Sequence, residues 1–453
     1  MPLKVYNTLS RKKEVFKPIN DKNVKFFVCG ITSYDYAHIG HAKTYVQFDL
    51  IVKYLRYLKY NVFYLQNITD IDDKIIKRSI EKNISWENLA RKYEKEFLED
   101  IKSLNVTSVN KYARATDYIK EIKSQVKRLI DKKIAYKISD GYYFDLEKFK
   151  EYGKLAKRKA VEAEDAVSRI DENKEKKNKG DFCLWKFSKP SEPSWKFELG
   201  SGRPGWHIED TAITEKELGA QYDVHGGAID LIFPHHEAEI AQMESISGKK
   251  PLVKYWLHTA FLNINKQKMS KSLKNFLTIK EALKEYDPRV LRLFFISQHY
   301  RTTIDFSYEV LEQSKNSLEK IDSFILYLKE SKEKDDLILI KKTREDFEKA
   351  MNDDFNTPQA FAVIYNFMKE VNKKGGGKKS YNLMLELDKV LDLNLKNIKP
   401  IKLEKDIYNL VEQRELARKN KNFKKADELR EKLFKLGIIL EDTKEGVKWK
   451  KKS

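Results

Sequence analysis

The chain has 453 residues, of which 41% are hydrophobic and 35% are charged, and its formal net charge is +20. This length predicts several domains with sizeable cores, and no apolar run approaches the roughly 18 residues that a membrane-spanning helix needs. The first residues lack the apolar stretch of a secretory signal, and two cysteines cannot build a disulfide framework, so we expect a cytoplasmic protein. The positive charge fits either a lysine-rich codon bias or a polyanionic partner such as RNA.

Residues 24–69 show the pattern of a β-α-β unit, with strands expected over 25–29 and 61–67 and a helix over 44–58. The string HIGH stands just before this helix and contains His38 and His41. We expect both histidines at the N-terminus of the helix, where free N–H groups and partial positive charge favour phosphate.

A second string, KMSKS, carries Lys268 and Lys271 on an expected loop. Two lysines there can neutralise the charge that builds on a departing pyrophosphate, because phosphoryl chemistry asks a protein mainly for positioning and charge stabilisation. Either string alone could be a solvated polar turn or a satisfied histidine pair. Together they predict a site that binds ATP and transfers its adenylyl group.

The residues between the two strings divide into an insertion and a second half of the nucleotide-binding fold. Residues 72–136 have a mostly helical pattern, whereas 137–205 combine short strands with polar and Pro/Gly-rich stretches. In the second half we expect a strand that ends at 223–225, a helix over 235–247 and a strand over 255–264.

All eight histidines lie at or before residue 299. The last third of the chain belongs to a helical pattern over 289–395, with a turn at 373–380. Residues 404–453 indicate two helices followed by a short strand-like tail. We therefore expect the chemistry in the first two thirds of the chain.

A metal site is a further hypothesis. His235 and Glu239 stand four residues apart, as metal ligands on one helical face often do, and Cys29 lies at an expected strand end beside the ATP site. The alternative interpretation makes Cys29 a small core residue and His235 a helix cap.

Several longer motifs make the chain resemble the cysteinyl-tRNA synthetases over essentially its full length. They are CGITSYDYAHIGHA (29–42), NITDIDDK (67–74), GWHIE (205–209), HGG (225–227) with the segment 230–239, KMSKS (268–272), DDFNTP (353–358) and GIILEDT (437–443). The resemblance implies a cysteine–tRNA ligase of class I, with an α/β Rossmann-type catalytic domain split by a connective insertion, an all-helical bundle domain and a small C-terminal anticodon-binding domain. The implied bounds are 1–71 and 205–262 for the catalytic halves, 72–204 for the insertion, 263–300 for the lysine-loop region, 301–398 for the bundle and 399–453 for the anticodon-binding domain.

The resemblance also implies one zinc ion per chain, which binds the thiol of the substrate. Its ligands would be Cys29, Asp210, His235 and Glu239. Asp210 stands where the family more often has a second cysteine. Because a carboxylate oxygen is an acceptable zinc ligand, we predict a retained but weaker zinc site, against the alternative of weak or absent zinc. Cys183 lies in an apparent buried strand, and we interpret it as structural.

The remaining implied roles concern substrates. His38, His41, Lys268 and Lys271 would bind ATP with Mg²⁺ and act in catalysis; Thr69, Trp206 and Asp230 would surround the amino acid; Arg418, Phe423, Asp427 and Asp442 would face the anticodon. For the last four, a solvated charged helix is the competing interpretation. The implied partners are tRNA(Cys), ATP and L-cysteine, with no membrane, and we expect a monomer.

Three other functions share part of this pattern. A ligase that joins cysteine to an amino sugar would keep the catalytic motifs but lack the full anticodon end. A catalytically silent RNA-binding paralogue is favoured only by Asp210, and the intact HIGH and KMSKS strings oppose it. A general nucleotidyltransferase would fit the ATP motifs but neither the zinc ligands nor the length.

Overall fold

The computed structural model describes residues 1–158, 173–268, 276–399, 405–443 and 446–451. The chain separates into two compact units, Met1–Lys396 and Asn397–Ser453. Within the described residues, no helix combines the length and the apolar character that crossing a bilayer requires.

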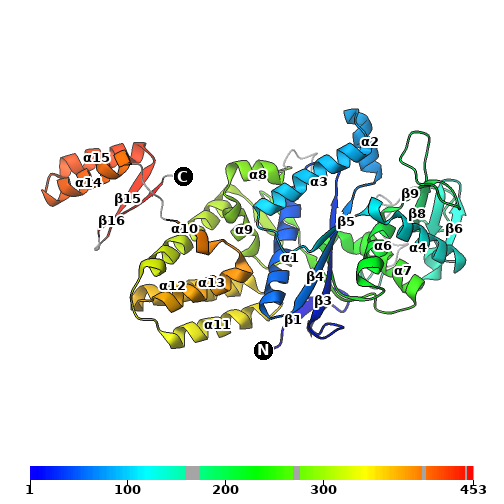
Figure 1. Ribbon diagram of the computed structural model, residues 1–453, viewed down its shortest axis with the longest axis horizontal. Helices are drawn as coiled ribbons and strands as arrows, with labels where there is room; N and C mark the ends of the chain where they lie inside the picture. The colour runs from blue at the N-terminus through cyan, green and yellow to red at the C-terminus, as the bar shows by residue number, and fades with distance from the viewer. Residues whose placement is uncertain (159–172, 269–275, 400–404, 444–445, 452–453) are drawn as a thin grey trace. The chain divides into compact units, whose positions relative to one another are not determined.

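The first unit is built on a five-stranded parallel sheet in the order β11-β10-β3-β4-β5 (Figure 1). The strands are β3 (Asn23–Thr32), β4 (Asn61–Thr69), β5 (Lys111–Arg114), β10 (Tyr222–Ala228) and β11 (Val253–Thr259). Strands covered on both faces carry consecutive apolar residues, as the buried Phe26, Phe27 and Val28 of β3 illustrate. Because all five strands are parallel, their carboxyl ends meet at one edge, where ligands of such sheets bind.

Helices cover both faces of this sheet (Figure 1). They are α1 (Ile39–Tyr57), α2 (Asp73–Lys82) and α3 (Trp86–Ser103) on one side and α4 (Ile119–Asp131), α6 (Trp206–Leu218) and α7 (Glu237–Ser247) toward the other. α1 is buried around most of its circumference because it lies between the sheet and helices of the bundle. Its side chains can therefore tie the sheet to its neighbours.

A four-stranded antiparallel sheet stands beside the parallel one. Its order is β6-β7-β8-β9, with β6 (Ala135–Ile138), β7 (Gly141–Phe144), β8 (Phe182–Phe187) and β9 (Gly202–Pro204). Cys183 lies in β8 with 9% of its surface exposed, which confirms the buried strand expected there.

Two small sheets and two short helices complete the catalytic part. They are β1 (Lys4–Asn7) with β2 (Lys12–Val15), then β13 (Gln267–Lys268), β12 (Leu262–Ile264) and β14 (Ile304–Phe306), and α8 (Ile279–Glu285) and α9 (Pro288–Ile296). The hairpin of β12 and β13 leads into the KMSKS string, so the pairing of these two strands positions the first residue of the string, Lys268.

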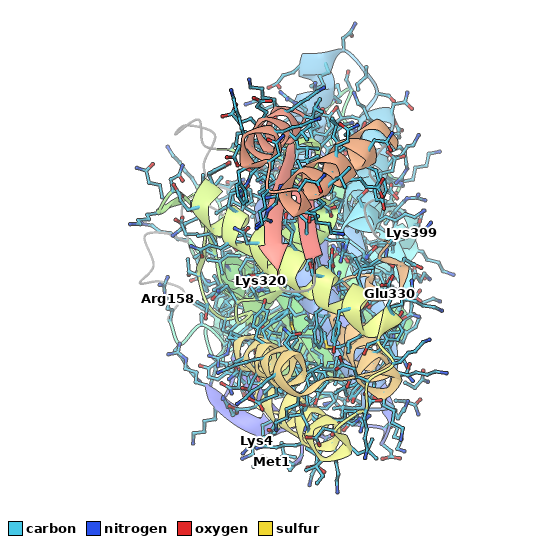
Figure 2. All side chains as sticks on the ribbon, turned by 90° about the vertical axis from the view of Figure 1, so that its left-hand side faces the viewer. Met1, Lys4, Arg158, Lys320, Glu330 and Lys399 are labelled. Carbon is cyan, nitrogen blue, oxygen red and sulfur yellow. The ribbon has the colours of Figure 1, made fainter. Side chains whose placement is uncertain are left out.

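Four helices form the bundle: α10 (Tyr308–Glu330), α11 (Leu337–Met351), α12 (Thr357–Lys374) and α13 (Lys378–Leu391). Figure 2 turns α10 toward the viewer, with exposed Lys320 and Glu330 along it. A buried ion pair joins the bundle side to α1: Arg292 Nη2 lies 2.7 Å from Asp49 Oδ2, and Arg292 Nε donates to the Leu391 carbonyl at 2.8 Å. Both charged side chains are at most 1% exposed.

The second unit has its own small core. It consists of α14 (Lys405–Lys419), α15 (Phe423–Lys435) and a hairpin of β15 (Ile438–Thr443) and β16 (Gly446–Lys451). Val411, Leu433, Ile438 and Leu440 fill its interior. The expected two helices are present, and the strand-like tail is a two-stranded hairpin.

The structure corrects four details of the sequence analysis. β5 lies within the segment expected to be mostly helical, and the strand expected to end at 225 runs on to Ala228. The single strand expected over 255–264 is β11 and β12, which belong to different sheets. α7 begins at Glu237, and His235 lies on the π-helical turn Ile232–His236 that runs into it, in which only Phe233 has non-helical φ and ψ angles.

Candidate functional site

The HIGH string caps the helix α1. His38 is the N-cap residue, and its Nδ1 accepts the backbone N–H of His41 at 3.3 Å while His41 Nδ1 accepts that of His38 at the same distance. The two rings stack with their centroids 3.7 Å apart. Loss of water around half-buried His41 lowers its pKa well below the usual value, and His38 lowers it further. His41 is therefore a neutral hydrogen-bonding group at a helix N-terminus.

The segment that follows the KMSKS string is bonded to the start of α1. Ile39 donates its N–H to the Leu277 carbonyl at 3.1 Å, and Ile279 donates to the Ala37 carbonyl at 2.9 Å. Lys268 ends β13; its side chain, and the whole of Lys271, lie outside the described residues.

Buried Lys43 ties α1 to the chain on the other side of that string. Its Nζ donates to the Ala260 carbonyl at 2.7 Å, to Gln47 Oε1 at 3.1 Å and to the Tyr300 carbonyl at 3.3 Å. Burial lowers the pKa of Lys43 to about 7, because all three acceptors are uncharged oxygens. The two sides of the KMSKS string are thus both hydrogen-bonded to the first turns of α1.

A buried group of ligand-type side chains lies at the same edge of the sheet. Its ligand atoms all lie within 4.8 Å of one another, and we call it the first ligand set: Cys29, Asp210, His235 and Glu239. Asp210 Oδ2 is 3.3 Å from Cys29 Sγ and 3.0 Å from His235 Nε2. The ligands come from β3, α6, the turn before α7 and α7 itself, so the fold assembles them from both catalytic halves.

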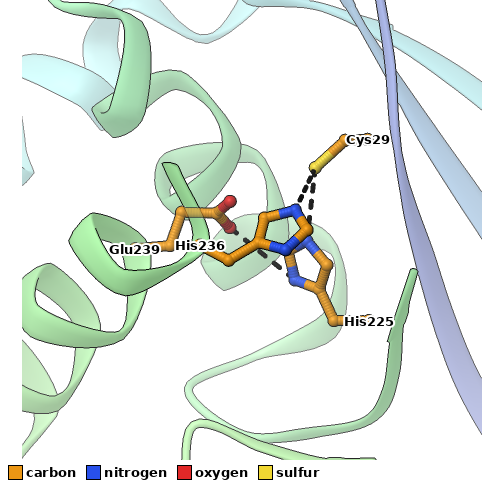
Figure 3. A group of neighbouring side chains, drawn as sticks. All are labelled: Cys29, His225, His236 and Glu239. Atoms are coloured by element: carbon orange, nitrogen blue, oxygen red, sulfur yellow. Dashed lines mark hydrogen bonds and ion pairs between the residues drawn. The ribbon is translucent and has the colours of Figure 1, made fainter. Parts of the chain in front are cut away.

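Two further histidines reach the same thiol and carboxylate, as Figure 3 shows. We call this group the histidine set: Cys29, His225, His236 and Glu239. Cys29 Sγ is 3.3 Å from His225 Nε2 and 3.2 Å from His236 Nε2. Burial lowers the pKa of both imidazoles, which keeps them in the neutral form that binds metals.

The chemistry of this pocket fits a divalent cation. Both carboxylate oxygens of Glu239 are buried without a hydrogen-bond partner among the described residues, which is costly unless a positive charge compensates them. Burial and the charge of Asp210 raise the pKa of Glu239 well above its usual value. Burial, followed by the same acidic neighbours, also raises the pKa of the Cys29 thiol. Thiolate, imidazole and carboxylate are the ligands that zinc prefers.

Neighbouring polar residues hold the first ligand set in place. Asn67 Nδ2 donates to Asp210 Oδ1 at 2.5 Å, and Thr69, at the end of β4, donates its hydroxyl to Glu209 Oε2 at 3.0 Å. Trp206 is 37% exposed and stacks on the His235 ring at a centroid distance of 4.3 Å. The structure thus brings Thr69 and Trp206 to the metal pocket. Asp230 lies exposed on a short turn after β10.

The residues predicted for the anticodon lie in the second unit. Phe423 begins α15 with 61% of its surface exposed, and Arg418 and Asp427 are also exposed. Asp442 lies in β15, and its side chain is outside the described residues.

Sequence reasoning missed the roles of His225, His236 and Asn67 at the pocket. The signal was available, because all three lie in motifs that the resemblance includes. Their contacts with Cys29 and Asp210 depend on three-dimensional packing that spacing along the chain does not reveal.

Family comparisons cover nearly the whole chain. The tRNA synthetases class I (C) catalytic domain matches residues 15–316, the DALR domain 346–395 and the cysteinyl-tRNA ligase anticodon binding domain 402–449. A protein named cysteine–tRNA ligase from Thermodesulfovibrio yellowstonii is 44% identical, over 99% of this chain and 100% of its own length. One of the same name from Thermococcus gammatolerans is 43% identical, over 100% of this chain and 99% of its own length.

Solved structures share the fold at low sequence identity. The structure of Mycobacterium tuberculosis methionyl-tRNA synthetase in complex with methionyl-adenylate aligns with 82% of this chain and with 90% of its own length. The TM-score is 0.58 and the sequence identity is 15%. A leucyl-tRNA synthetase of Agrobacterium radiobacter covers 84% with 86% of its own, at a TM-score of 0.61 and 9% identity. The predicted fold class is confirmed, and the chain belongs to the cysteinyl-tRNA synthetase family of class I aminoacyl-tRNA ligases.

Proposed function

We propose that the chain activates L-cysteine with Mg²⁺-ATP and transfers it to the 3′ end of tRNA(Cys), with a zinc ion in the first ligand set selecting the substrate thiol. Family membership supports the charging reaction. The observation that carries the zinc centre is Glu239, whose two buried oxygens lack hydrogen-bond partners among the described residues, beside Cys29 and His235.

In the proposed first step, the carboxylate of cysteine attacks the α-phosphate of ATP, giving cysteinyl-adenylate and pyrophosphate. His38 and His41 hold the phosphates at the N-terminus of α1, and Lys268 and Lys271 neutralise the departing pyrophosphate. A ribose hydroxyl of the tRNA then takes the cysteinyl group and AMP leaves.

Selectivity against serine is the reason for the metal. The two amino acids differ by one atom, and an apolar pocket discriminates by only about 1–3 kcal/mol. Zinc, when bound, lowers the pKa of a thiol and favours thiolate over an alcohol. Thr69, Trp206 and Asp230 would then orient the amino acid around the centre, supported by the stacking of Trp206 on His235.

The other proposed features follow the resemblance. Arg418, Phe423, Asp427 and Asp442 would read the anticodon, which the match of residues 402–449 to an anticodon binding domain supports. The domain bounds stay predictions, as do a monomeric state and a cytoplasmic location.

Charging of bulk tRNA by the purified full chain tests the proposal, with labelled cysteine as substrate and labelled serine as control. We expect cysteine-specific charging that falls on removal of zinc by a chelator and returns when zinc is added. Absence of charging in zinc-loaded protein would refute the ligase and favour the amino-sugar ligase or the silent paralogue. Charging that metal removal leaves unchanged would refute only the zinc centre.

A further inference from the structure

We propose that the histidine set is a second metal position in this chain, which holds a thiophilic divalent cation when Asp210 does not. This inference deepens the proposed zinc centre and rests on it. The two positions share Cys29 and Glu239, so one cation occupies one position at a time.

The separations between ligand atoms suit a tetrahedral ion. Cys29 Sγ lies 3.3 Å from His225 Nε2 and 3.2 Å from His236 Nε2. Zinc with one sulfur and one nitrogen ligand at ideal bond lengths places those two atoms about 3.5 Å apart. In Figure 3 the thiol of Cys29 points at both rings, and an oxygen of Glu239 lies within 4.8 Å of each of the other three ligand atoms.

The outer nitrogen of each imidazole is already engaged. His225 Nδ1 is hydrogen-bonded to the Tyr222 hydroxyl at 2.7 Å and lies 3.7 Å from Glu239 Oε2. His236 Nδ1 is hydrogen-bonded to His258 Nε2 at 2.8 Å, and His258 Nδ1 to the Thr8 hydroxyl at 2.7 Å. Metal-binding histidines characteristically use one nitrogen for the metal and the other for such a partner, which orients the ring. Both Nε2 atoms are therefore oriented toward Cys29 as ligands would be.

Asp210 does not need a cation as Glu239 does. Its Oδ1 accepts from Asn67 at 2.5 Å, and His235 Nε2 lies 3.0 Å from its Oδ2 and 3.3 Å from Glu239 Oε1. Neither oxygen of Glu239 makes a hydrogen bond among the described residues. When the cation moves from the first ligand set to the histidine set, Asp210 thus keeps hydrogen-bonding partners. One that leaves Glu239 would strand a buried charge.

The charge balance and the softness of the ligands also favour the histidine set as an alternative position for the cation. In the histidine set, one thiolate and one carboxylate neutralise a divalent cation, whereas the first ligand set adds a second carboxylate and leaves a net negative charge in a dry pocket. Two imidazole nitrogens are also softer zinc ligands than one nitrogen and a carboxylate oxygen. With a carboxylate at position 210, the histidine set can therefore compete for the cation in this chain.

Co²⁺ binding to the full-length protein tests the inference. The variants are Asp210→Ala, Asp210→Ala/His236→Ala and the matched control Asp210→Ala/His41→Ala, in which a histidine outside both sets is removed. Equilibrium dialysis gives the stoichiometry, competition with a chelator gives the affinity, and X-ray absorption counts the sulfur and imidazole ligands. Thermal unfolding of each chelated variant checks folding, and Asp210→Ala/His225→Ala replaces the double variant if it does not fold.

We expect Asp210→Ala to retain one Co²⁺ per chain, with affinity lowered about 10- to 100-fold and two imidazole ligands instead of one. The His236 double variant should lose at least another 100-fold, whereas the His41 double variant should match Asp210→Ala. The inference is overturned if Asp210→Ala binds no Co²⁺, if it still shows one imidazole, or if the two double variants bind equally. A wild-type protein that binds no Co²⁺ or Zn²⁺ would overturn the proposed zinc centre itself.

Discussion

Replacing Lys43 by methionine tests whether a buried lysine side chain couples the first turns of α1 to the chain beside the KMSKS string. Methionine keeps an unbranched side chain of similar length but removes the charge and all three donors. The variant leaves Gln47 Oε1 and the Ala260 carbonyl without the bond from Nζ, while the Tyr300 carbonyl keeps the N–H of Ala260 at 2.9 Å.

Two opposing effects set the change in stability. Each orphaned buried acceptor costs about 1–3 kcal/mol, so the two together cost about 2–6 kcal/mol. Against this, a pKa lowered from 10.5 to about 7 means that burying the amine costs about 4 kcal/mol at pH 7.5, which methionine avoids. The free energy of unfolding should therefore change by less than about 2 kcal/mol in either direction at this pH.

The pH dependence separates the two effects. Because the folded-state pKa of Lys43 is lowered, the unfolded chain binds more protons between pH 7 and 10.5, and the wild type gains stability as pH rises through that window. Relative to Lys43→Met, the wild type should gain about 2 kcal/mol from pH 7 to pH 9. Exposed Lys369 on α12 offers the control, since Lys369→Met should show no such difference.

Urea unfolding at pH 7, 8 and 9 measures the difference, and cysteine-dependent ATP–pyrophosphate exchange measures the functional coupling. We expect kcat of exchange to fall about 10- to 100-fold, because displacement of catalytic groups by about 1 Å has effects of that size. Parallel stability curves for wild type and Lys43→Met would refute the claim that burial lowers this pKa. Unchanged exchange in a folded variant would refute the coupling.

Three further variants test other parts of the structure. Glu239→Gln should raise the melting temperature of chelated protein, because burial disfavours the ionised form of Glu239 in the folded chain. In the presence of zinc it should lower the melting temperature relative to wild type. Calorimetry with and without zinc measures both, and the same order of melting temperatures in both conditions contradicts a metal role. Arg292→Met should lower the free energy of unfolding by about 2–6 kcal/mol, because it orphans the buried carbonyls of Leu104 and Leu391, while Asp49 keeps its ion pair with Lys53. Urea unfolding measures this, and a loss below about 1 kcal/mol would argue against these buried hydrogen bonds. Phe423→Ala should weaken tRNA charging while leaving ATP–pyrophosphate exchange intact, and loss of both activities would indicate misfolding instead.

The sequence predicted the β-α-β unit because local patterns specify it: an apolar run, a polar turn and an amphipathic helix each have their own period. It missed β5, whose four residues, Lys-Tyr-Ala-Arg, carry too few apolar positions to show any period. That strand forms because β4 offers it a parallel partner at the sheet edge, which is a tertiary cause.

At the site, the resemblance identified Cys29, Asp210, His235 and Glu239, and the structure brings these four together. Spacing had suggested that His235 and Glu239 share a helical face, and their side chains do meet, with His235 Nε2 3.3 Å from Glu239 Oε1, although His235 lies on a π-helical turn before α7. The role of His236 could not be reached in this way, because its contact with Cys29 crosses 207 positions of sequence.

The position of β10 between β3 and β11 has a consequence for folding during synthesis. About 190 residues separate the end of β3 from the start of β10, and a ribosome adding about 5–20 residues per second takes roughly 10–40 s to make them. Through that interval the backbone groups of β3 that later pair with β10 have no strand beside them, and Cys29 lacks the histidines and Glu239 of both ligand sets. The nascent first half therefore carries an open apolar strand edge and a solvent-accessible thiol, and slow translation of the insertion prolongs its exposure to aggregation and oxidation.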